Sequence, residues 1–151
     1  YDEMVGMVSY GSPASPSLCK GICGEEYKSD VIELNRLVLK DNLPNEASFL
    51  VARSLKLLPK PKVVVSYADA GGQYHTGFVY QATNFLFTGT TKPRTDIAGK
   101  DGKHSRHHLG DITKRVDRTA KHRYVYFIGS KRERKVLREA LRYPVLDYPK
   151  P

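Results

Sequence analysis

The segment SYAD, residues 66–69, places polar side chains at the end of an apolar run, where they could bind a ligand or move a proton. The full run, KVVVSYAD, is too short and too rich in valine for a helix, and it predicts an interior strand of a parallel sheet. Ligands of α/β sheets bind at the carboxyl ends of such strands, so Asp69 is a candidate base, with Ser66 and Tyr67 beside it. Asp69 could equally cap the following turn, DAGGQ.

Polar residues also interrupt the segment VIELNRLVL, residues 31–39. Its alternation predicts a strand with Ile32, Leu34 and Val38 on one face and Glu33, Asn35 and Leu37 on the other. Asn35 and Arg36 form a polar notch in this strand. A buried arginine is costly unless it is paired, so we expect Glu33 or Asp69 to be its partner, either structurally or within a site.

The segment HTGFVYQATNFLFTG, residues 75–89, predicts a short helix from Gly77 to Phe85, followed by a strand. The predicted apolar face of this helix consists of Phe78, Ala82, Phe85 and Leu86. Tyr80 does not lie on that face. A tyrosine hydroxyl has an ordinary pKa near 10 and is protonated at neutral pH, so it can donate a proton. The alternative is a tyrosine packed at a helix end with its hydroxyl in water.

The remaining patterns predict a single α/β domain over residues 1–151. Residues 3–11 read as a strand, and residues 12–30, rich in Pro, Ser and Gly, as a connection. A helix is predicted from Pro44 and Asn45 to the PKP of residues 59–61, with Ala47, Leu50, Val51, Leu55 and Leu58 on its apolar side. Strand, helix, strand and helix then form one crossover unit over residues 31–85.

Positive charge is concentrated in the C-terminal third of the chain. The formal charge is +9, but residues 1–91 hold 8 Lys and Arg against 9 Asp and Glu, whereas residues 92–142 hold 16 against 6. In SKRERKVLREALRYP, a helix is predicted with Val136, Leu137, Ala140 and Leu141 buried and with a basic stripe of Lys131, Arg134, Lys135, Arg138 and Arg142. The stripe is either a solvated surface or a phosphate-binding face.

Residues 90–122 lack clear periodicity and predict a basic loop, or a hairpin that turns near Asp101 and Gly102. RYVYFIG follows as a last strand, and residues 143–151 form a tail. The composition contains no signal peptide or membrane-spanning run, and two cysteines do not make a disulfide framework, so we expect a soluble protein of a reducing cytosol. Cys19, Cys23, His104, His107 and His108 match no zinc spacing, and we expect no metal.

Taken together, these segments resemble the GNAT superfamily of acyltransferases. YQATNF is similar to the GNAT pattern of Tyr, three residues, Gly and Phe, with Asn84 in place of the glycine. Within that superfamily the chain resembles the Mom-type DNA modification proteins of Mu-like bacteriophages. This narrower resemblance rests on ELNRL, SYAD, GFVYQATNFLFTG, KHRYVYF and YPVLDYPKP. It implies a GNAT-like mixed sheet with crossover helices, and we expect this chain to lack the first N-terminal elements of that fold.

The resemblance also implies roles for individual residues. Tyr80 would be the general acid that protonates the leaving group, and the other candidate catalytic residues are Asp69, Ser66, Tyr67, Asn35 and Arg36. Candidate cofactor-binding residues are Leu37, Leu39, Asn45, Ala47, Ser48, Gln81 and Asn84. The resemblance implies acetyl-CoA or a related acyl-CoA, but KDNLPNEAS lacks the glycine-rich loop that approaches its pyrophosphate, and Glu46 opposes that charge. The sequence leaves the true group donor open.

The implied activity is conversion of the exocyclic amine of adenine to an acetamido (carbamoylmethyl) derivative, which protects phage DNA from host restriction. The partner would be double-stranded DNA, in the cytoplasm of the bacterial host, with the target base flipped out of the duplex. Candidate DNA-binding residues are Lys103, Arg106, His107, Lys121, Arg123, Lys131, Arg134 and Lys135. Two alternatives are a GNAT enzyme acting on a small amine or a protein, and a non-catalytic nucleic-acid binder.

Overall fold

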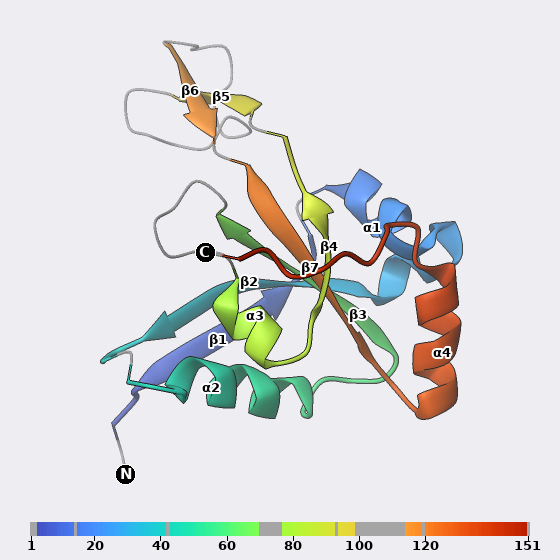
Figure 1. Ribbon diagram of the computed structural model, residues 1–151, viewed down its shortest axis with the longest axis horizontal. Helices are drawn as coiled ribbons and strands as arrows, with labels where there is room; N and C mark the ends of the chain where they lie inside the picture. Colours follow the sequence, from blue (N-terminus) through green and yellow to red (C-terminus); the bar gives the residue numbers. More distant parts are fainter. Residues whose placement is uncertain are drawn as a thin grey trace.

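A computed structural model describes residues 3–13, 15–41, 43–69, 77–92, 94–98, 114–118 and 120–150. In this part of the chain, a five-stranded mixed sheet in the order β1-β2-β3-β7-β4 carries helices on both faces (Figure 1). Only β2 and β3 are parallel neighbours in it. The strands are β1 (Gly6–Gly11), β2 (Val31–Leu39), β3 (Lys62–Asp69), β4 (Leu86–Thr90) and β7 (Lys121–Ile128). The predicted mixed α/β architecture is confirmed.

One face of the sheet packs against α2 (Glu46–Leu55) and α3 (Phe78–Ala82). This α2–α3 core includes the helix residues Val51 and Leu55 and the buried strand residues Leu34, Val64 and Tyr124. The predicted crossover unit of strand, helix, strand and helix is confirmed. The predicted apolar face of the last helix is wrong, because α3 ends at Ala82, and Phe78 is 72% exposed whereas Phe85, beyond the helix, is fully buried.

The opposite face packs against α1 (Pro16–Cys23), the 3-10 helix η1 (Glu25–Asp30) and α4 (Lys131–Ala140). The prediction of an irregular connection over residues 12–30 is therefore wrong. Ser15 caps α1 by accepting a hydrogen bond from the Leu18 amide, and Pro16 occupies its first turn. Ile22 is fully buried, and both cysteines are free thiols. Together with Leu137 they contribute to an α1–α4 core.

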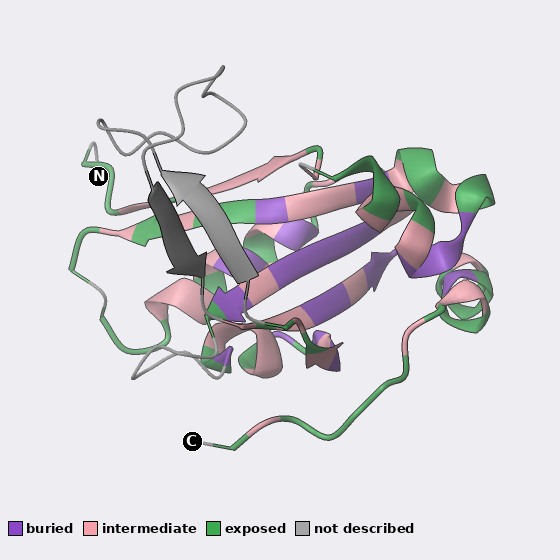
Figure 2. Cartoon of the chain, turned by 90° about the horizontal axis from the view of Figure 1, so that it is seen from above, coloured by how far each residue is buried: buried purple, intermediate pink, exposed green. Residues whose placement is uncertain are grey.

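Helix α4 begins with a capping box between Ser130 and Glu133. Leu137 is only 2% exposed and anchors the helix to the sheet. Val136 was expected on the buried side but is 42% exposed, which corrects that prediction. Ala140 and Leu141 are partly buried, as the pattern predicted. Figure 2 shows that the buried positions concentrate along the central strands, in agreement with the fully buried Val63 to Val65 run.

A second, two-stranded sheet and the C-terminal tail complete the described structure. β5 (Arg94–Ala98) and β6 (Lys114–Arg118) pair as an antiparallel two-stranded sheet. Ala98 is opposite Lys114, a register that differs from that of a hairpin turning at residues 101–102. The turn expected at residues 101–102 lies outside the described residues. The C-terminal tail, residues 143–150, contacts β4 and the residue before it. The Leu146 amide donates to the Phe87 carbonyl at 2.8 Å, and the Tyr148 hydroxyl donates to the Phe85 carbonyl at 2.5 Å.

Candidate functional site

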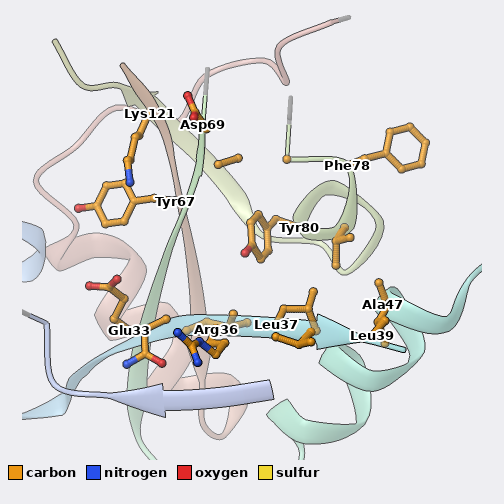
Figure 3. A pocket seen from close by; sticks show the side chains of 16 residues that line it. Glu33, Arg36, Leu37, Leu39, Ala47, Tyr67, Asp69, Phe78, Tyr80 and Lys121 are labelled. Carbon is orange, nitrogen blue, oxygen red and sulfur yellow. The ribbon is translucent and has the colours of Figure 1, made fainter. Parts of the chain in front are cut away.

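Strands β2 and β3 pair only at their beginnings and then separate. The paired residues are 31–33 of β2 and 63–65 of β3, although β2 continues to Leu39 and β3 to Asp69. The separation opens a cavity of about 860 Å³ between the two strands, α2, α3 and the start of β7 (Figure 3). A cavity of this size lies within the range of roughly 300–1,000 Å³ that is usual for ligand pockets.

A β-bulge at Asn35 shapes the wall of this cavity. Ser9 of β1 is opposite Arg36 and Tyr10 is opposite Leu34, so Asn35 has no counterpart on β1. The extra residue shifts the alternation of β2 by one position. Leu37 therefore packs with the α2–α3 core on the same face as Leu34, and the predicted division of the two faces is wrong for the second half of the strand. Asn35 itself is exposed and accepts a 2.6 Å hydrogen bond from the Ser9 hydroxyl.

On the α2–α3 face of the cavity, Tyr80 and Ser66 form a pair of hydroxyl groups. The Tyr80 hydroxyl is hydrogen-bonded to Ser66, which is fully buried and donates to the Leu34 carbonyl at 3.2 Å. Burial raises the pKa of Tyr80, the hydrogen bond with Ser66 lowers it, and the charge of Glu33 raises it. Since the net shift is upward from 10.0, this hydroxyl holds its proton at neutral pH.

The ring of Tyr80 is fixed by its neighbours. Its centroid lies 5.3 Å from that of Phe85 and 5.5 Å from that of Tyr124. Helix α3 begins after Gly77, whose φ of +87° favours glycine and where a Cβ atom would lie 2.3 Å from the Tyr124 ring. The start of α3 is thus packed directly on β7, and this contact sets the position of Tyr80.

The other side of the cavity, which we call the carboxylate side, consists of Glu33, Tyr67 and Lys121. These residues come from β2, β3 and β7 and lie together, apart from Tyr80 (Figure 3). Burial raises the pKa of Glu33, and the charge of Lys121 opposes that shift. Burial also raises the pKa of Tyr67 to about 12, with Arg123 opposing the shift and the Glu33 charge adding to it.

Most of the predicted catalytic residues meet at this cavity. Its lining includes the predicted residues Asn35, Arg36, Leu37, Leu39, Ala47, Tyr67, Asp69 and Tyr80, and Ser66 contacts Tyr80. Asp69 is exposed at the end of β3, opposite Lys121 in the register of β3 and β7. Arg36 is exposed and forms no ion pair with a described residue, so the expectation of a buried arginine paired with an acid is wrong.

Four predicted cofactor-binding residues do not line the cavity. Asn45 precedes α2 and accepts a hydrogen bond from the Ser48 hydroxyl at its carbonyl, 3.2 Å away. Gln81 donates from Nε2 to the Tyr124 hydroxyl at 3.1 Å and to the Pro149 carbonyl at 3.3 Å, so it anchors the tail. Asn84 follows α3 with a φ of 67°, a conformation that asparagine tolerates better than most residues. Binding roles for these residues stay predictions.

Sequence reasoning missed several residues that line the cavity: Glu33, Leu34, Val38, Gly77, Phe78 and Val79. Glu33 was considered only as a partner for Arg36. The available signal was an acidic residue in the apolar first half of a strand, next to a polar notch. Whether such a residue faces solvent or a cavity depends on where the neighbouring strands separate, which the local pattern does not contain.

The predicted DNA-binding residues fall into different parts of the fold. Helix α4 carries three of them in exposed positions: Lys131, Arg134 and Lys135. This helix follows the C-terminal end of β7, whereas Lys121 is at the N-terminal end of that strand. Arg123 is occupied structurally, because it donates to the Thr88 hydroxyl at 2.9 Å and to the Thr88 carbonyl at 3.0 Å, and it lies 3.6 Å from the ring centroid of Tyr143. Lys103, Arg106 and His107 lie outside the described residues. DNA contacts by all of these residues stay predictions.

Two other features are absent from the described part of the chain. None of its helices has the length and hydropathy needed to cross a membrane. Among the same residues, no three His, Cys, Asp or Glu side chains gather as a potential metal site.

Comparison with known proteins identifies the family. The chain matches the Mom protein family over residues 1–150. It is also similar to the protein named methylcarbamoylase mom of Escherichia phage Mu, with 32% identity over 93 residues. That alignment covers 58% of this chain and 38% of the phage Mu protein, so the matched segment spans less than half of this relative. Because the family match extends over nearly the whole sequence, the chain belongs to the Mom protein family.

Proposed function

We propose that this protein is a phage DNA modification enzyme that converts the exocyclic amine of adenine to its carbamoylmethyl (acetamido) derivative. The observation that carries the proposal is the family match over residues 1–150, together with a relative whose name describes methylcarbamoyl transfer. The reaction would take place in the cytoplasm of the bacterial host and would protect phage DNA from restriction. An adenine inside a duplex would have to be flipped out to reach the cavity.

In the proposed reaction, the adenine nitrogen forms a bond to the carbamoylmethyl carbon while the bond from that carbon to the leaving group breaks. Asp69 would take the proton released by the amine. Tyr80 would give its hydroxyl proton to the leaving group. Burial of Tyr80 supports this role because it raises the pKa of the hydroxyl and keeps the proton available.

We also propose that the fold is of the GNAT type. The support is the crossover unit β2-α2-β3-α3, the bulge at Asn35 and the separation of β2 from β3 at the cavity. The group donor does not follow from this fold. The first turn of α2, where a pyrophosphate of coenzyme A would approach backbone amides, contains Glu46, and one buried carboxylate oxygen of Glu46 has no hydrogen-bond partner among the described residues. These residues do not fit a pyrophosphate, so no step is assigned to coenzyme A.

The direct test is the chemical composition of DNA from cells that express the protein. Plasmid DNA would be digested to nucleosides and analysed by mass spectrometry, with plasmid from cells carrying an empty vector as the control. We expect a deoxyadenosine species in which one hydrogen is replaced by a carbamoylmethyl group. An unmodified deoxyadenosine pool, in cells where the protein is folded, would refute DNA modification and favour a GNAT enzyme that acts on a small amine or a protein.

A further inference from the structure

The carboxylate side of the cavity contains polar groups that have no partner among the described residues. Within the part of the chain that the structure describes, neither the Glu33 carboxylate nor the Tyr67 hydroxyl forms a hydrogen bond or an ion pair. The same holds there for the Lys121 ammonium group. All three nevertheless line one cavity, from three neighbouring strands.

Glu33 and Tyr67 are half-buried and Lys121 is exposed, and among the described residues neither Glu33 nor Tyr67 has a side-chain oxygen that is both fully buried and unpaired. A ligand in the cavity could therefore bind these groups without first breaking a hydrogen bond or ion pair between described residues. Glu33 and Lys121 lie close enough for their charges to influence each other, yet they do not form an ion pair. A ligand group between them could satisfy both: the carboxylate only accepts hydrogen bonds, and the ammonium only donates them.

The chemistry of these side chains defines the ligand edge that they would recognise. We propose that Glu33, Tyr67 and Lys121 form a subsite for an NH₂ group that stands next to a hydrogen-bond acceptor. The NH₂ group would donate to Glu33, and Lys121 and the Tyr67 hydroxyl would donate to the neighbouring acceptor. A keto edge, as in guanine or thymine, would direct its oxygen lone pairs at the Glu33 carboxylate and be rejected.

Two sources of this edge exist in the proposed reaction, on which this identification rests. One is the amino edge of adenine, where the exocyclic amine stands beside a ring nitrogen that accepts. The other is the primary carboxamide of the carbamoylmethyl group. In either case the subsite would share the cavity with Tyr80 and orient a reacting partner within it.

Binding of small probes to the intact protein tests the subsite without requiring catalysis. The probes are 9-methyladenine and acetamide, each paired with an analogue whose NH₂ group is dimethylated and can no longer donate. Affinities would be measured from amide chemical-shift changes in nuclear magnetic resonance titrations. Glu33→Gln tests the subsite, and Glu26→Gln is the matched control, because Glu26 is exposed on η1 and does not line the cavity.

We expect at least one NH₂ probe to bind the wild type and the Glu26→Gln variant, and to bind Glu33→Gln roughly tenfold more weakly or worse, the scale of a lost hydrogen bond to a charged group. The dimethylated analogue should not bind. If 9-methyladenine binds the wild type more tightly than Glu33→Gln, the ligand of the subsite is the base. If acetamide shows this difference in affinity, the ligand is the transferred group. Failure of both probes, or equal binding to both variants, would overturn the proposal. Probe binding with unmodified DNA would refute the proposed reaction and leave the subsite standing.

Discussion

Replacement of Tyr80 by phenylalanine removes one hydroxyl group from the cavity and preserves the ring. The ring would keep its contacts with Phe85 and Tyr124, at centroid distances of 5.3 and 5.5 Å. The hydrogen bond with Ser66 would be lost, but Ser66 would still donate to the Leu34 carbonyl at 3.2 Å. The free energy of unfolding should therefore decrease by about 1 kcal/mol at most, the typical net contribution of one hydrogen bond.

The effect on DNA modification should be much larger than the effect on stability. General acid catalysis typically contributes about 10² to 10⁴ in rate, so loss of this proton donor should lower modification by roughly 10² or more. A factor of 10² corresponds to about 2.7 kcal/mol of lost transition-state stabilisation. The measured quantity would be the modified fraction of deoxyadenosine per folded protein, with thermal unfolding measured for the same preparations.

Tyr10→Phe is the matched control for this experiment. The Tyr10 hydroxyl forms a 2.7 Å hydrogen bond with the Ser54 hydroxyl, its ring packs against the same α2–α3 core, and burial also raises its pKa. Tyr10 does not line the cavity. Its substitution should cost a similar small amount of stability and leave modification intact. Equal modification per folded molecule by the two variants would show that Tyr80 has only a packing role.

Three further experiments test the site, the packing and the charged surface. Burial raises the pKa of Glu33 above 4.5 in the folded state, so ionisation of this carboxyl lowers the stability of the fold as the pH rises from the unfolded-state pKa through the folded-state pKa. The Glu33→Gln variant should therefore unfold at the same temperature as the wild type near about pH 4 and at a higher temperature near about pH 7. Leu137→Ala should lower the free energy of unfolding by about 2–5 kcal/mol in denaturant titrations, whereas Val136→Ala should change it by about 1 kcal/mol or less, because only Leu137 is buried. If α4 contacts DNA phosphates, simultaneous replacement of three α4 cations by glutamine should reduce the slope of log DNA affinity against log salt concentration by about 2 to 3. An unchanged slope would show that α4 is not part of the DNA-binding surface. The three residues are Lys131, Arg134 and Lys135.

The sequence predicted best those elements whose burial repeats at a regular period. The valine run of β3 forms the middle of the sheet, and α2 buries Val51 and Leu55 as its spacing required. Helix α1 was missed because its composition, rich in Pro, Ser and Gly, is typical of a loop. Its helical signal was the Ser15 cap with Pro16, followed by Leu18 and Ile22 at a spacing of four residues, and this signal was too short to outweigh the composition.

The location of a candidate residue was predictable where its place along an element determined its exposure. Asp69 was placed at the end of an interior strand, and the structure finds it there beside the cavity. The location of residues at the N-terminus of α2 was less predictable, since Asn45 and Ser48 do not line the cavity. Their neighbour Ala47 does, because it lies on the side of α2 that faces the opening (Figure 3).

The error in β2 has one physical cause, and that cause also helps to form the cavity. A strand whose side chains alternate strictly keeps one face on the core along its whole length. The unpaired Asn35 breaks that alternation, so Leu34 and Leu37 pack on the same core three positions apart while Val38 is 51% exposed. Beyond the same region β2 no longer pairs with β3, and the space between the strands holds the candidate site. Bulges concentrate beside active sites because they redirect side chains in this way. The polar pair Asn35 and Arg36, placed between apolar residues, was therefore a signal of the break in the strand rather than of a buried ion pair.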